Sequence, residues 1–152
     1  FPDKAEKLCR SLALKIKKKI KKIDLILAPA MGGIIIGYEI GKILKKETIF
    51  CERVNGKFKL RRGFKIKPQT RVLIVEDVIT TGKSSLECSH LVKDNNANIV
   101  GYACIIDRSN GKSGIKDKII SQVELNIPTY KKDNLPKELQ SIEAVKPGSR
   151  NL

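Results

Sequence analysis

The sequence has few of the residues that cross-link a fold, stack on nucleic-acid bases or bind metals. It contains no tryptophan, four phenylalanines, three tyrosines, one histidine and four cysteines, and no two cysteines form a C-x-x-C pair. That spacing excludes a zinc ribbon and a thioredoxin motif, and scattered cysteines suit a reducing, cytoplasmic compartment. The longest nearly uncharged apolar stretch, Leu25 to Tyr38, is shorter than the roughly 18 residues that a membrane span needs. We therefore expect neither a disulfide scaffold nor a membrane protein.

The length and composition predict a globular protein with a hydrophobic core. Of the 152 residues, 41% are hydrophobic, and the mean hydropathy is −0.23. Residues 1–152 show no linker and no repeat, so we expect a single domain. The chain begins with phenylalanine rather than methionine, so one interpretation is that it is a fragment of a longer protein.

Positive charge is abundant and unevenly distributed. The chain has 24 lysines, 7 arginines and 16 acidic residues, which gives a net charge of +15. Residues 1–67 contain 19 basic and 6 acidic side chains, and residues 68–152 contain 12 and 10. A solvated lysine-rich surface, an anionic small molecule and nucleic acid are the possible explanations. Nucleic acid is the least favoured partner, because arginines that read guanine and aromatic residues that stack on bases are both scarce.

Helix and strand patterns alternate along the chain. Apolar residues at helical spacing predict helices at about 3–22, 34–44 and 83–95. Short apolar runs predict strands at 24–28, 48–52, 71–77, 99–106 and, more weakly, 122–127. Residues 53–67 mix charges, glycines and isolated apolar residues, as in a hairpin or a mobile loop. The alternation predicts an α/β fold with an open, mainly parallel sheet and helices on both faces.

Two glycines in the second predicted helix, Gly37 and Gly41, stand four residues apart. They lie on one face of the helix, where the missing side chains would allow another backbone to approach closely.

The clearest chemical signal follows the strand predicted at 71–77. Glu76 and Asp77 end this strand, and residues 80–84, Thr-Thr-Gly-Lys-Ser, open the next helix. Such a turn gathers backbone N–H groups, hydroxyls and an ammonium at a helix N-terminus, which favours a phosphate. A Walker A loop is excluded because it needs a glycine at position 77, where the aspartate would repel phosphates. Two carboxylates beside a phosphate site suit a sugar phosphate, because carboxylates accept hydrogen bonds from neighbouring hydroxyls.

Residues 72–85 resemble the phosphoribosyl-pyrophosphate (PRPP) motif of type I phosphoribosyltransferases, in which two acids and a Thr-Thr-Gly turn follow an apolar strand. Four more segments resemble the orotate phosphoribosyltransferases of that family: residues 28–39, residues 52–64, Asp107-Arg108 and the ending at 145–150. The resemblance implies the type I phosphoribosyltransferase fold. It also implies transfer of the 5-phosphoribosyl group from PRPP to orotate, which yields orotidine 5′-phosphate and pyrophosphate in de novo pyrimidine biosynthesis.

The resemblance further implies roles for the matching residues. Those expected to hold the ribose hydroxyls are Glu76 and Asp77. Those expected to bind the 5-phosphate are Thr80, Thr81, Gly82, Lys83 and Ser84. Those expected to bind the pyrophosphate are Ala30, Met31, Gly32, Gly33, Arg53, Lys57 and Lys59. Mg²⁺ is the expected cofactor, held mainly through PRPP without a dedicated set of protein ligands.

Arg53 and Lys57 are the candidate catalytic residues, because basic residues of this loop clamp the pyrophosphate in the family. Orotate would contact Thr80 and Arg108, with the Arg108 guanidinium pairing with its carboxylate. Each cation also has a plainer interpretation. Arg53, Lys57 and Lys59 would then be surface charges, and Arg108 would form a local ion pair with Asp107.

The resemblance also bears on assembly and on alternatives. The clamping loop of the family usually reaches into a neighbouring subunit, which implies a homodimer. Family members carry an N-terminal segment over the base pocket, and it has no counterpart in the sequence from Phe1 onward. Two alternative functions are a phosphoribosyltransferase for another base and a PRPP-sensing regulator that binds nucleic acid on the same fold.

Overall fold

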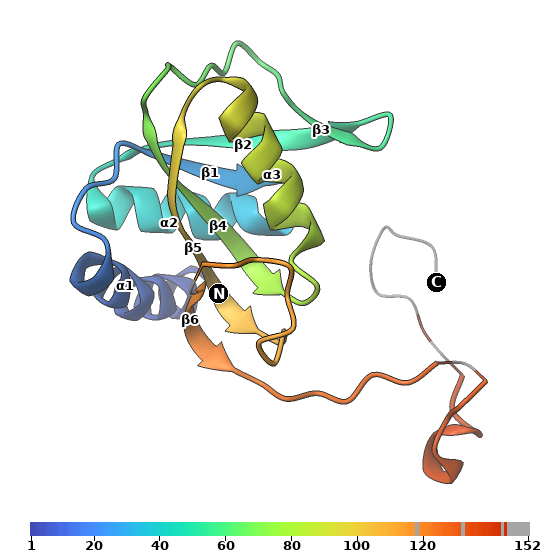
Figure 1. The fold of residues 1–152 in the computed structure, drawn as a ribbon. Helices are drawn as coiled ribbons and strands as arrows, with labels where there is room; N and C mark the ends of the chain where they lie inside the picture. Colours follow the sequence, from blue (N-terminus) through green and yellow to red (C-terminus); the bar gives the residue numbers. More distant parts are fainter. Residues whose placement is uncertain (118, 132, 144, 146–152) are drawn as a thin grey trace.

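A six-stranded sheet forms the centre of the molecule, in the strand order β3-β2-β1-β4-β5-β6 (Figure 1). The computed structural model describes residues 1–117, 119–131, 133–143 and 145. The strands are β1 (Leu25–Pro29), β2 (Glu47–Val54), β3 (Lys57–Leu60), β4 (Arg71–Ile79), β5 (Asn98–Asp107) and β6 (Ile119–Glu124). Every neighbouring pair is parallel except β2 and β3, which form an antiparallel hairpin. The expected open, mainly parallel sheet is confirmed.

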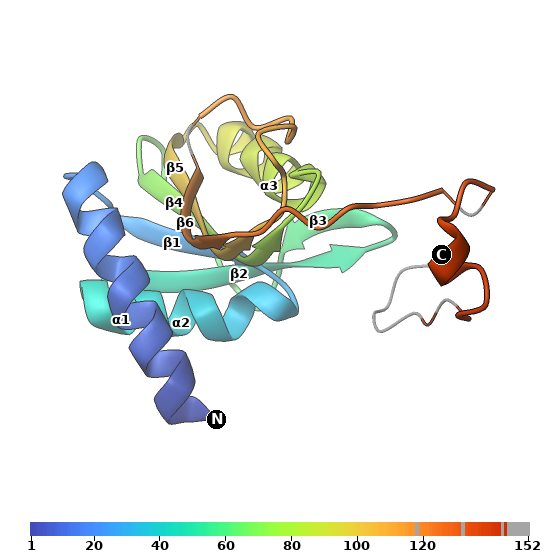
Figure 2. The same ribbon diagram turned by 90° about the horizontal axis from the view of Figure 1, so that it is seen from below.

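Helices cover both faces of the sheet, as the alternation of elements predicts. Helices α1 (Pro2–Lys19) and α2 (Gly32–Leu44) lie on one face, and α3 (Lys83–Asp94) lies on the other (Figure 2). A short 3-10 helix, η1 (Lys137–Leu139), follows in the C-terminal segment. Within the described ranges, no helix combines the length and the apolar character that crossing a membrane requires.

The buried strands supply two hydrophobic cores, one on each face. Leu25 and Leu27 of β1 pack on the side of α3, whereas Ile26 between them packs on the side of α1 and α2. In β4, Val72 and Leu73 divide between the two cores in the same way. Strands buried on both faces carry apolar residues at successive positions, which explains why these segments show no alternation in the sequence.

Close packing of α2 on the sheet depends on its glycines. A Cβ atom on Gly37 would lie 2.8 Å from the Cβ of Ala28, and one on Gly41 would lie 1.9 Å from the Oγ1 of Thr48. Both distances are too short for a side chain, so α2 approaches β1 and β2 more closely than any other residue at these positions would permit. This confirms the close approach expected from their spacing.

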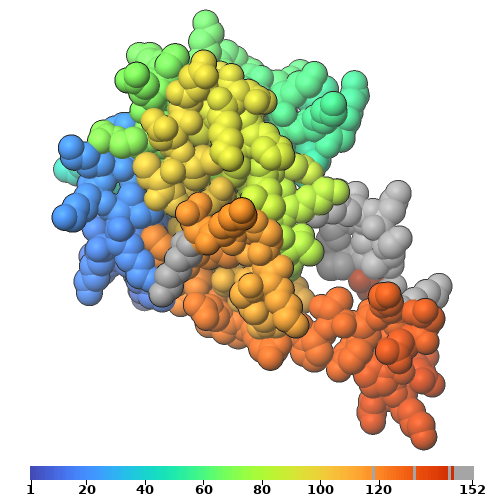
Figure 3. Space-filling model, viewed as in Figure 1, coloured from blue at the N-terminus to red at the C-terminus, as the bar shows by residue number. Residues whose placement is uncertain are grey.

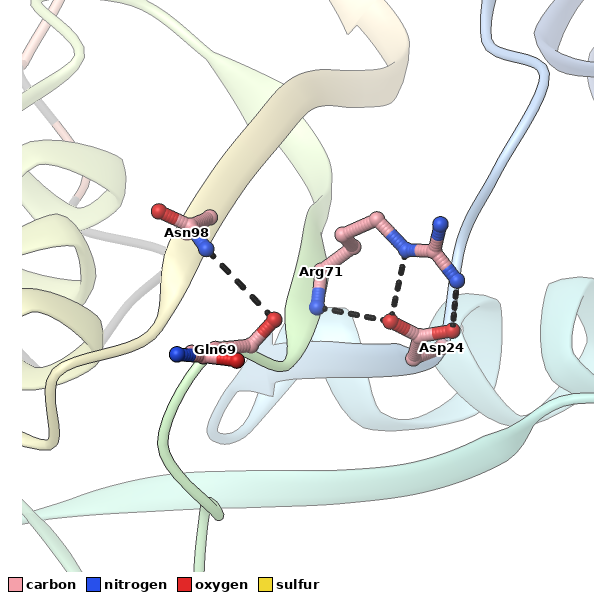
Figure 4. Close-up of polar contacts among 4 residues, drawn as sticks. All are labelled: Asp24, Gln69, Arg71 and Asn98. Carbon is pink, nitrogen blue, oxygen red and sulfur yellow. Dashed lines mark hydrogen bonds and ion pairs between the residues drawn. The ribbon is translucent and has the colours of Figure 1, made fainter.

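A pair of side chains joins the starts of two neighbouring strands (Figure 4). Arg71, the first residue of β4, donates from Nε to Oδ2 of Asp24 at 2.7 Å and from Nη2 to Oδ1 at 2.6 Å. Its backbone N–H donates to Oδ2 at 2.9 Å. Nearby, Nδ2 of Asn98 donates to the backbone oxygen of Gln69 at 3.4 Å. These contacts lie at the amino ends of the parallel strands.

The segment at 53–67 contains a hairpin, one of the two forms expected from its sequence. Asn55 and Gly56 form its turn with φ angles of 50° and 77°. Positive φ at both central residues is characteristic of the tightest hairpin turns, and an Asn-Gly pair favours it. Lys57–Leu60 then returns alongside β2 as β3.

The last strand differs from its expected position. It covers Ile119–Glu124, whereas the sequence pattern placed it at 122–127. Ile120 is buried in the core beneath α1 and α2, but Val123, Leu125 and Ile127 are exposed. The apolar residues within the predicted range are therefore exposed, and the strand lies earlier, where Ile120 is buried.

The chain after β6 extends away from the body of the molecule, as Figures 1 and 3 show in orange and red. Its side chains from Ile127 to Lys131 are exposed. Residues 146–150 of the ending that resembles orotate phosphoribosyltransferases lie outside the described residues.

Candidate functional site

A cavity of about 1190 Å³ opens at the carboxyl ends of the parallel strands. Most of its lining comes from three stretches that are distant in the sequence. They are residues 29–32 and 34 at and after the end of β1, residues 50, 52, 53 and 56 of β2 and its turn, and residues 76–85 from β4 into α3. Arg62 and Glu87 complete the wall. In open α/β sheets this edge is where ligands bind.

The five residues expected to bind a 5-phosphate all line the cavity. Gly82 precedes α3 with a φ of 75°, a left-handed conformation that glycine adopts without strain. The N–H of Lys83 donates to Oγ1 of Thr81 at 3.3 Å, which holds the turn against the start of the helix. The backbone N–H groups at a helix N-terminus and the positive end of the helix dipole attract anions. The turn thus has the chemistry of a phosphate site.

The two acids at the end of β4 lie on the same wall of the cavity. Glu76 is buried, with 7% of its surface exposed, and Asp77 is half-buried. Oδ1 of Asp77 accepts a hydrogen bond from the N–H of Val78 at 2.8 Å. This bond orients the Asp77 carboxylate without occupying all of its acceptor positions.

The glycines after β1 make room for this acidic wall. A Cβ atom on Gly32 would lie 2.1 Å from Oδ2 of Asp77, and one on Gly33 would lie 3.0 Å from the backbone oxygen of Val75. Ala30, Met31 and Gly32 line the cavity, but Gly33 is buried beneath them and is not part of the lining. Gly32 and Gly33 therefore bring two chain segments into contact at the site.

Arg53 reaches the cavity from the end of β2 and is held by three partners. Its Nη2 lies 2.5 Å from Oε2 of Glu87 on α3. Its Nη1 donates to the backbone oxygen of Gly56 at 2.7 Å, and its guanidinium carbon lies 4.2 Å from the centre of the Phe58 ring. Arg53 is therefore a fixed cation in the wall rather than a freely solvated surface charge.

The two lysines grouped with Arg53 in the sequence do not share its position. Lys57 and Lys59 are exposed on β3 and are not among the residues that line the cavity. In the hairpin, Arg53 stands opposite Phe58, whereas Lys59 stands opposite Glu52 and lies on the other face.

Arg108 lies beside the cavity rather than in its lining. Its backbone N–H donates to the oxygen of Ile79, a lining residue, at 2.8 Å. Its side chain is half-buried, and its Nε is buried without a hydrogen-bond partner among the described residues. Oδ1 of Asp107 accepts a hydrogen bond from the N–H of Ser109, and within the described part of the chain no ion pair joins Asp107 to Arg108.

Several residues that line the cavity were given no function by the sequence analysis. The most polar of them are Arg62, whose Nε lies 3.2 Å from Oε1 of Glu52, and Glu87, which pairs with Arg53. Glu87 follows Lys83 by four residues, so helical spacing placed it on the face of the phosphate turn. Arg62 lies in the segment at 52–64 that resembles the family, but nothing local to its sequence shows that it lines the cavity.

The donors at the site suit a magnesium ion that arrives with a diphosphate. Mg²⁺ is usually bound through one or two carboxylates together with phosphate oxygens and water. Glu76 and Asp77 provide carboxylate oxygens beside the phosphate turn. Across the described ranges, no three His, Cys, Asp or Glu side chains gather into a metal site of their own.

Comparison with known proteins gives the same family throughout. Residues 3–141 match the phosphoribosyl transferase domain. The chain is 50% identical to the orotate phosphoribosyltransferase of Methylorubrum extorquens, over 99% of this chain and 78% of that protein. It is 46% identical to that of Parvibaculum lavamentivorans and 44% identical to that of Caulobacter vibrioides, again over 99% of this chain and 78% of each protein.

Solved structures share the fold at lower sequence identity. An adenine phosphoribosyltransferase superposes with a TM-score of 0.72 at 20% identity, covering 81% of this chain and 82% of that one. The UMP synthase of Leishmania donovani superposes with a TM-score of 0.68 at 18% identity, covering 82% of this chain and 28% of that one. These likenesses establish the type I phosphoribosyltransferase fold.

Proposed function

The chain belongs to the phosphoribosyltransferase family, and we propose that it transfers the 5-phosphoribosyl group of PRPP to orotate. The products are orotidine 5′-phosphate and pyrophosphate. The observation that carries the proposal is the joint placement of the acid pair Glu76-Asp77 and the phosphate turn at residues 80–84 on one cavity wall. Relatives of that name at 44–50% identity support orotate as the base.

In the proposed complex, the ribose 5-phosphate lies along this wall. The turn from Thr80 to Ser84 binds the phosphate through N–H groups, hydroxyls and the Lys83 ammonium. Glu76 and Asp77 accept hydrogen bonds from the ribose 2′- and 3′-hydroxyls. These contacts fix the sugar, so that its C1 faces the interior of the cavity and the attacking base.

The leaving pyrophosphate faces Arg53 and residues 30–33, of which Gly33 lies beneath the lining. Bond cleavage at C1 builds positive charge on the ribose and negative charge on the departing group. Arg53 stabilises that negative charge, and Arg62 is placed to add a second guanidinium. Mg²⁺, held mainly through PRPP beside Glu76 and Asp77, would supply further neutralisation of the pyrophosphate.

Orotate would be recognised through its carboxylate by Arg108, with Thr80 touching the ring. The buried, unpartnered Nε of Arg108 supports an anionic partner for this side chain. Arg108 does not line the cavity itself, however, and this observation favours a second candidate function. In that alternative, the protein uses the same ribose and phosphate contacts for another base.

A homodimer and a cytoplasmic location complete the proposal. Lys57 and Lys59 are exposed and lie outside the lining of the cavity of their own chain, which supports a role at the site of a second copy. Sedimentation of the purified protein distinguishes the dimer from a monomer. The four buried, unpaired cysteines suit a reducing compartment.

The deciding experiment mixes the protein with PRPP, Mg²⁺ and orotate and follows the ultraviolet absorbance of orotate. We expect a loss of absorbance that requires all three and that falls sharply in Asp77→Asn, because the amide no longer accepts the same hydrogen bonds. If PRPP is consumed only in the presence of another base, that base takes the place of orotate in the proposed reaction. A protein that neither binds PRPP nor consumes any base would overturn the proposal.

A further inference from the structure

The contact between Glu87 and Arg53 ties together two walls of the cavity. Helix α3 begins at Lys83, so Glu87 lies one helical turn beyond the phosphate turn. Arg53 lies near the end of β2, on the far side of β1 from β4. The 2.5 Å separation of Arg53 Nη2 and Glu87 Oε2 therefore fixes the position of the cation relative to the phosphate turn.

Three contacts restrain the orientation of the Arg53 guanidinium. Glu87, the oxygen of Gly56 and the ring of Phe58 each contact a different part of its guanidinium. Its side chain is 31% exposed, whereas that of Arg62, another arginine of the lining, is 63% exposed. A guanidinium restrained in this way needs little further ordering when an anion binds, which favours affinity.

We propose that Glu87 is a positioning residue, whose carboxylate holds the Arg53 guanidinium in the orientation that receives the pyrophosphate group. The inference rests on the proposed function, because it takes pyrophosphate as the anion beside Arg53. The proposal explains why Glu87, which is negatively charged, lines a cavity that binds an anion.

That negative charge makes the proposal testable by the sign of an effect. Removing a carboxylate from an anion site would tighten anion binding if charge alone mattered. Removing a positioning residue has the opposite result, because Arg53 then samples orientations that do not meet the anion. The direction in which pyrophosphate affinity changes therefore shows which of the two effects dominates.

The first test titrates inorganic pyrophosphate with Mg²⁺ into the protein by calorimetry. For Glu87→Ala we expect about tenfold weaker binding, since small misplacements of a binding group have effects of at least this size. For Glu87→Gln we expect a smaller loss, because the amide keeps an oxygen that can face the Arg53 guanidinium. Unchanged or tighter binding in both variants would overturn the proposal.

A matched control is available on α1. Arg10 and Glu6 form another short arginine–glutamate pair, at 2.6 Å, and neither residue lines the cavity. Glu6→Gln should leave pyrophosphate affinity unchanged. A loss equal to that of Glu87→Gln would show that the effect is unspecific and would contradict the proposal.

A double-mutant cycle separates positioning from general stabilisation. Arg53→Ala should weaken pyrophosphate binding, and adding Glu87→Ala should then change the affinity by less than about twofold, because the group to be positioned is gone. Equal losses from Glu87→Ala in both backgrounds would overturn the proposal. If a melting curve shows that Glu87→Ala is unfolded, the cycle is run with Glu87→Gln.

Failure of the proposed function has a different signature. Pyrophosphate affinity is measured without orotate, so an inactive protein whose pyrophosphate binding still depends on Glu87 would contradict only the proposed reaction. Turnover of orotate with no effect of Glu87 would contradict only this inference. A wild-type protein that binds no pyrophosphate would overturn it as well.

Discussion

At the scale of single residues, the site depends on positions where a side chain is missing. Gly32 is the clearest case, because a Cβ there would lie 2.1 Å from Oδ2 of Asp77. That carboxylate has to move before any other residue fits. The glycine therefore acts on substrate binding through the acid whose position it permits.

We expect Gly32→Ala to weaken PRPP binding by about tenfold or more, because the displaced Asp77 no longer meets the ribose hydroxyls. Calorimetric titration of PRPP with Mg²⁺ measures the change. Ile35→Ala, at an exposed position on the same helix, is the control and should bind PRPP like the wild type. Wild-type affinity in Gly32→Ala would show that Asp77 does not contact the ribose.

Arg108 separates recognition of the base from recognition of PRPP. We expect Arg108→Ala to reduce kcat/KM for orotate by about tenfold or more, because a charged hydrogen-bond partner is lost. PRPP affinity should stay nearly the same, since Arg108 lies outside the cavity lining. Steady-state kinetics with each substrate varied in turn make the comparison. An equal loss for both substrates would contradict the assignment of Arg108 to orotate.

At the scale of elements, the pair formed by Asp24 and Arg71 joins the residue before β1 to the first residue of β4. Hydrogen bonds from Arg71 hold the pKa of Asp24 well below its usual value. A carboxyl whose pKa is lower in the folded state stabilises that state at pH values above its unfolded pKa, about 3.9, and the stabilisation disappears as the pH falls through the folded pKa.

Asp24→Asn should therefore lower the melting temperature by a few degrees near neutral pH. The difference from the wild type should shrink below about pH 4 and vanish in stronger acid, where the wild-type carboxyl is protonated as well. Thermal unfolding measured across this range tests the expectation. A difference that stays constant down to low pH would mean that the pair contributes through packing rather than charge.

Most elements could be predicted from the sequence, because their signals are local. The buried runs at Leu25–Pro29 and Arg71–Ile79 and the phosphate turn each follow from neighbouring residues. The position of β6 could not be predicted, since it depends on the burial of Ile120 beneath helices that are distant in the sequence. The contact of Glu87 with Arg53 was equally hidden, because it joins elements more than 30 residues apart in the printed sequence.

The separation of Arg53 from its neighbouring lysines has a similar cause. All three stand within seven residues of one another, and the sequence offers one explanation for all. The turn at Asn55-Gly56 fixes the hairpin register and, with it, which side chains share a face. That register puts Arg53 on the face of Phe58 and puts Lys57 and Lys59 on the other face.

At the scale of the whole molecule, much of the positive charge lies away from the cavity. Lys17, Lys18 and Lys19 end α1, and Lys21 and Lys22 follow them before the amino end of β1. Lys45 and Lys46 connect α2 to the amino end of β2. The cavity is at the opposite, carboxyl end of these strands. Direct contact with a bound substrate therefore cannot account for these lysines, which supports the solvated-surface explanation for this part of the charge.

The thiols report on the integrity of the whole fold, because all four cysteines are buried. Burial raises the pKa of Cys9 to about 11 and that of Cys104 to about 12. A hydrogen bond with Cys51, together with burial, raises the pKa of Cys88. The thiolate is the reactive form, so each of these shifts lowers reactivity.

We therefore expect the native protein at about pH 8 to react with a thiol reagent only as fast as it unfolds. In urea, all four thiols should react within the mixing time. Absorbance of the released reagent measures both rates. A thiol that reacts at once in the native protein would show that one of the two cores opens locally.

The hairpin that carries Arg53 also determines how the sheet meets other chains. Strand β3 is one rim of the sheet, and among the described residues no strand pairs with its outer edge. Such rims invite a foreign strand to add on. Strand β3 is only four residues long, and two of these are exposed lysines. Shortness and like charge both discourage the growth of a shared sheet, so Lys57 and Lys59 would protect the protein against aggregation whether or not they also serve the substrate.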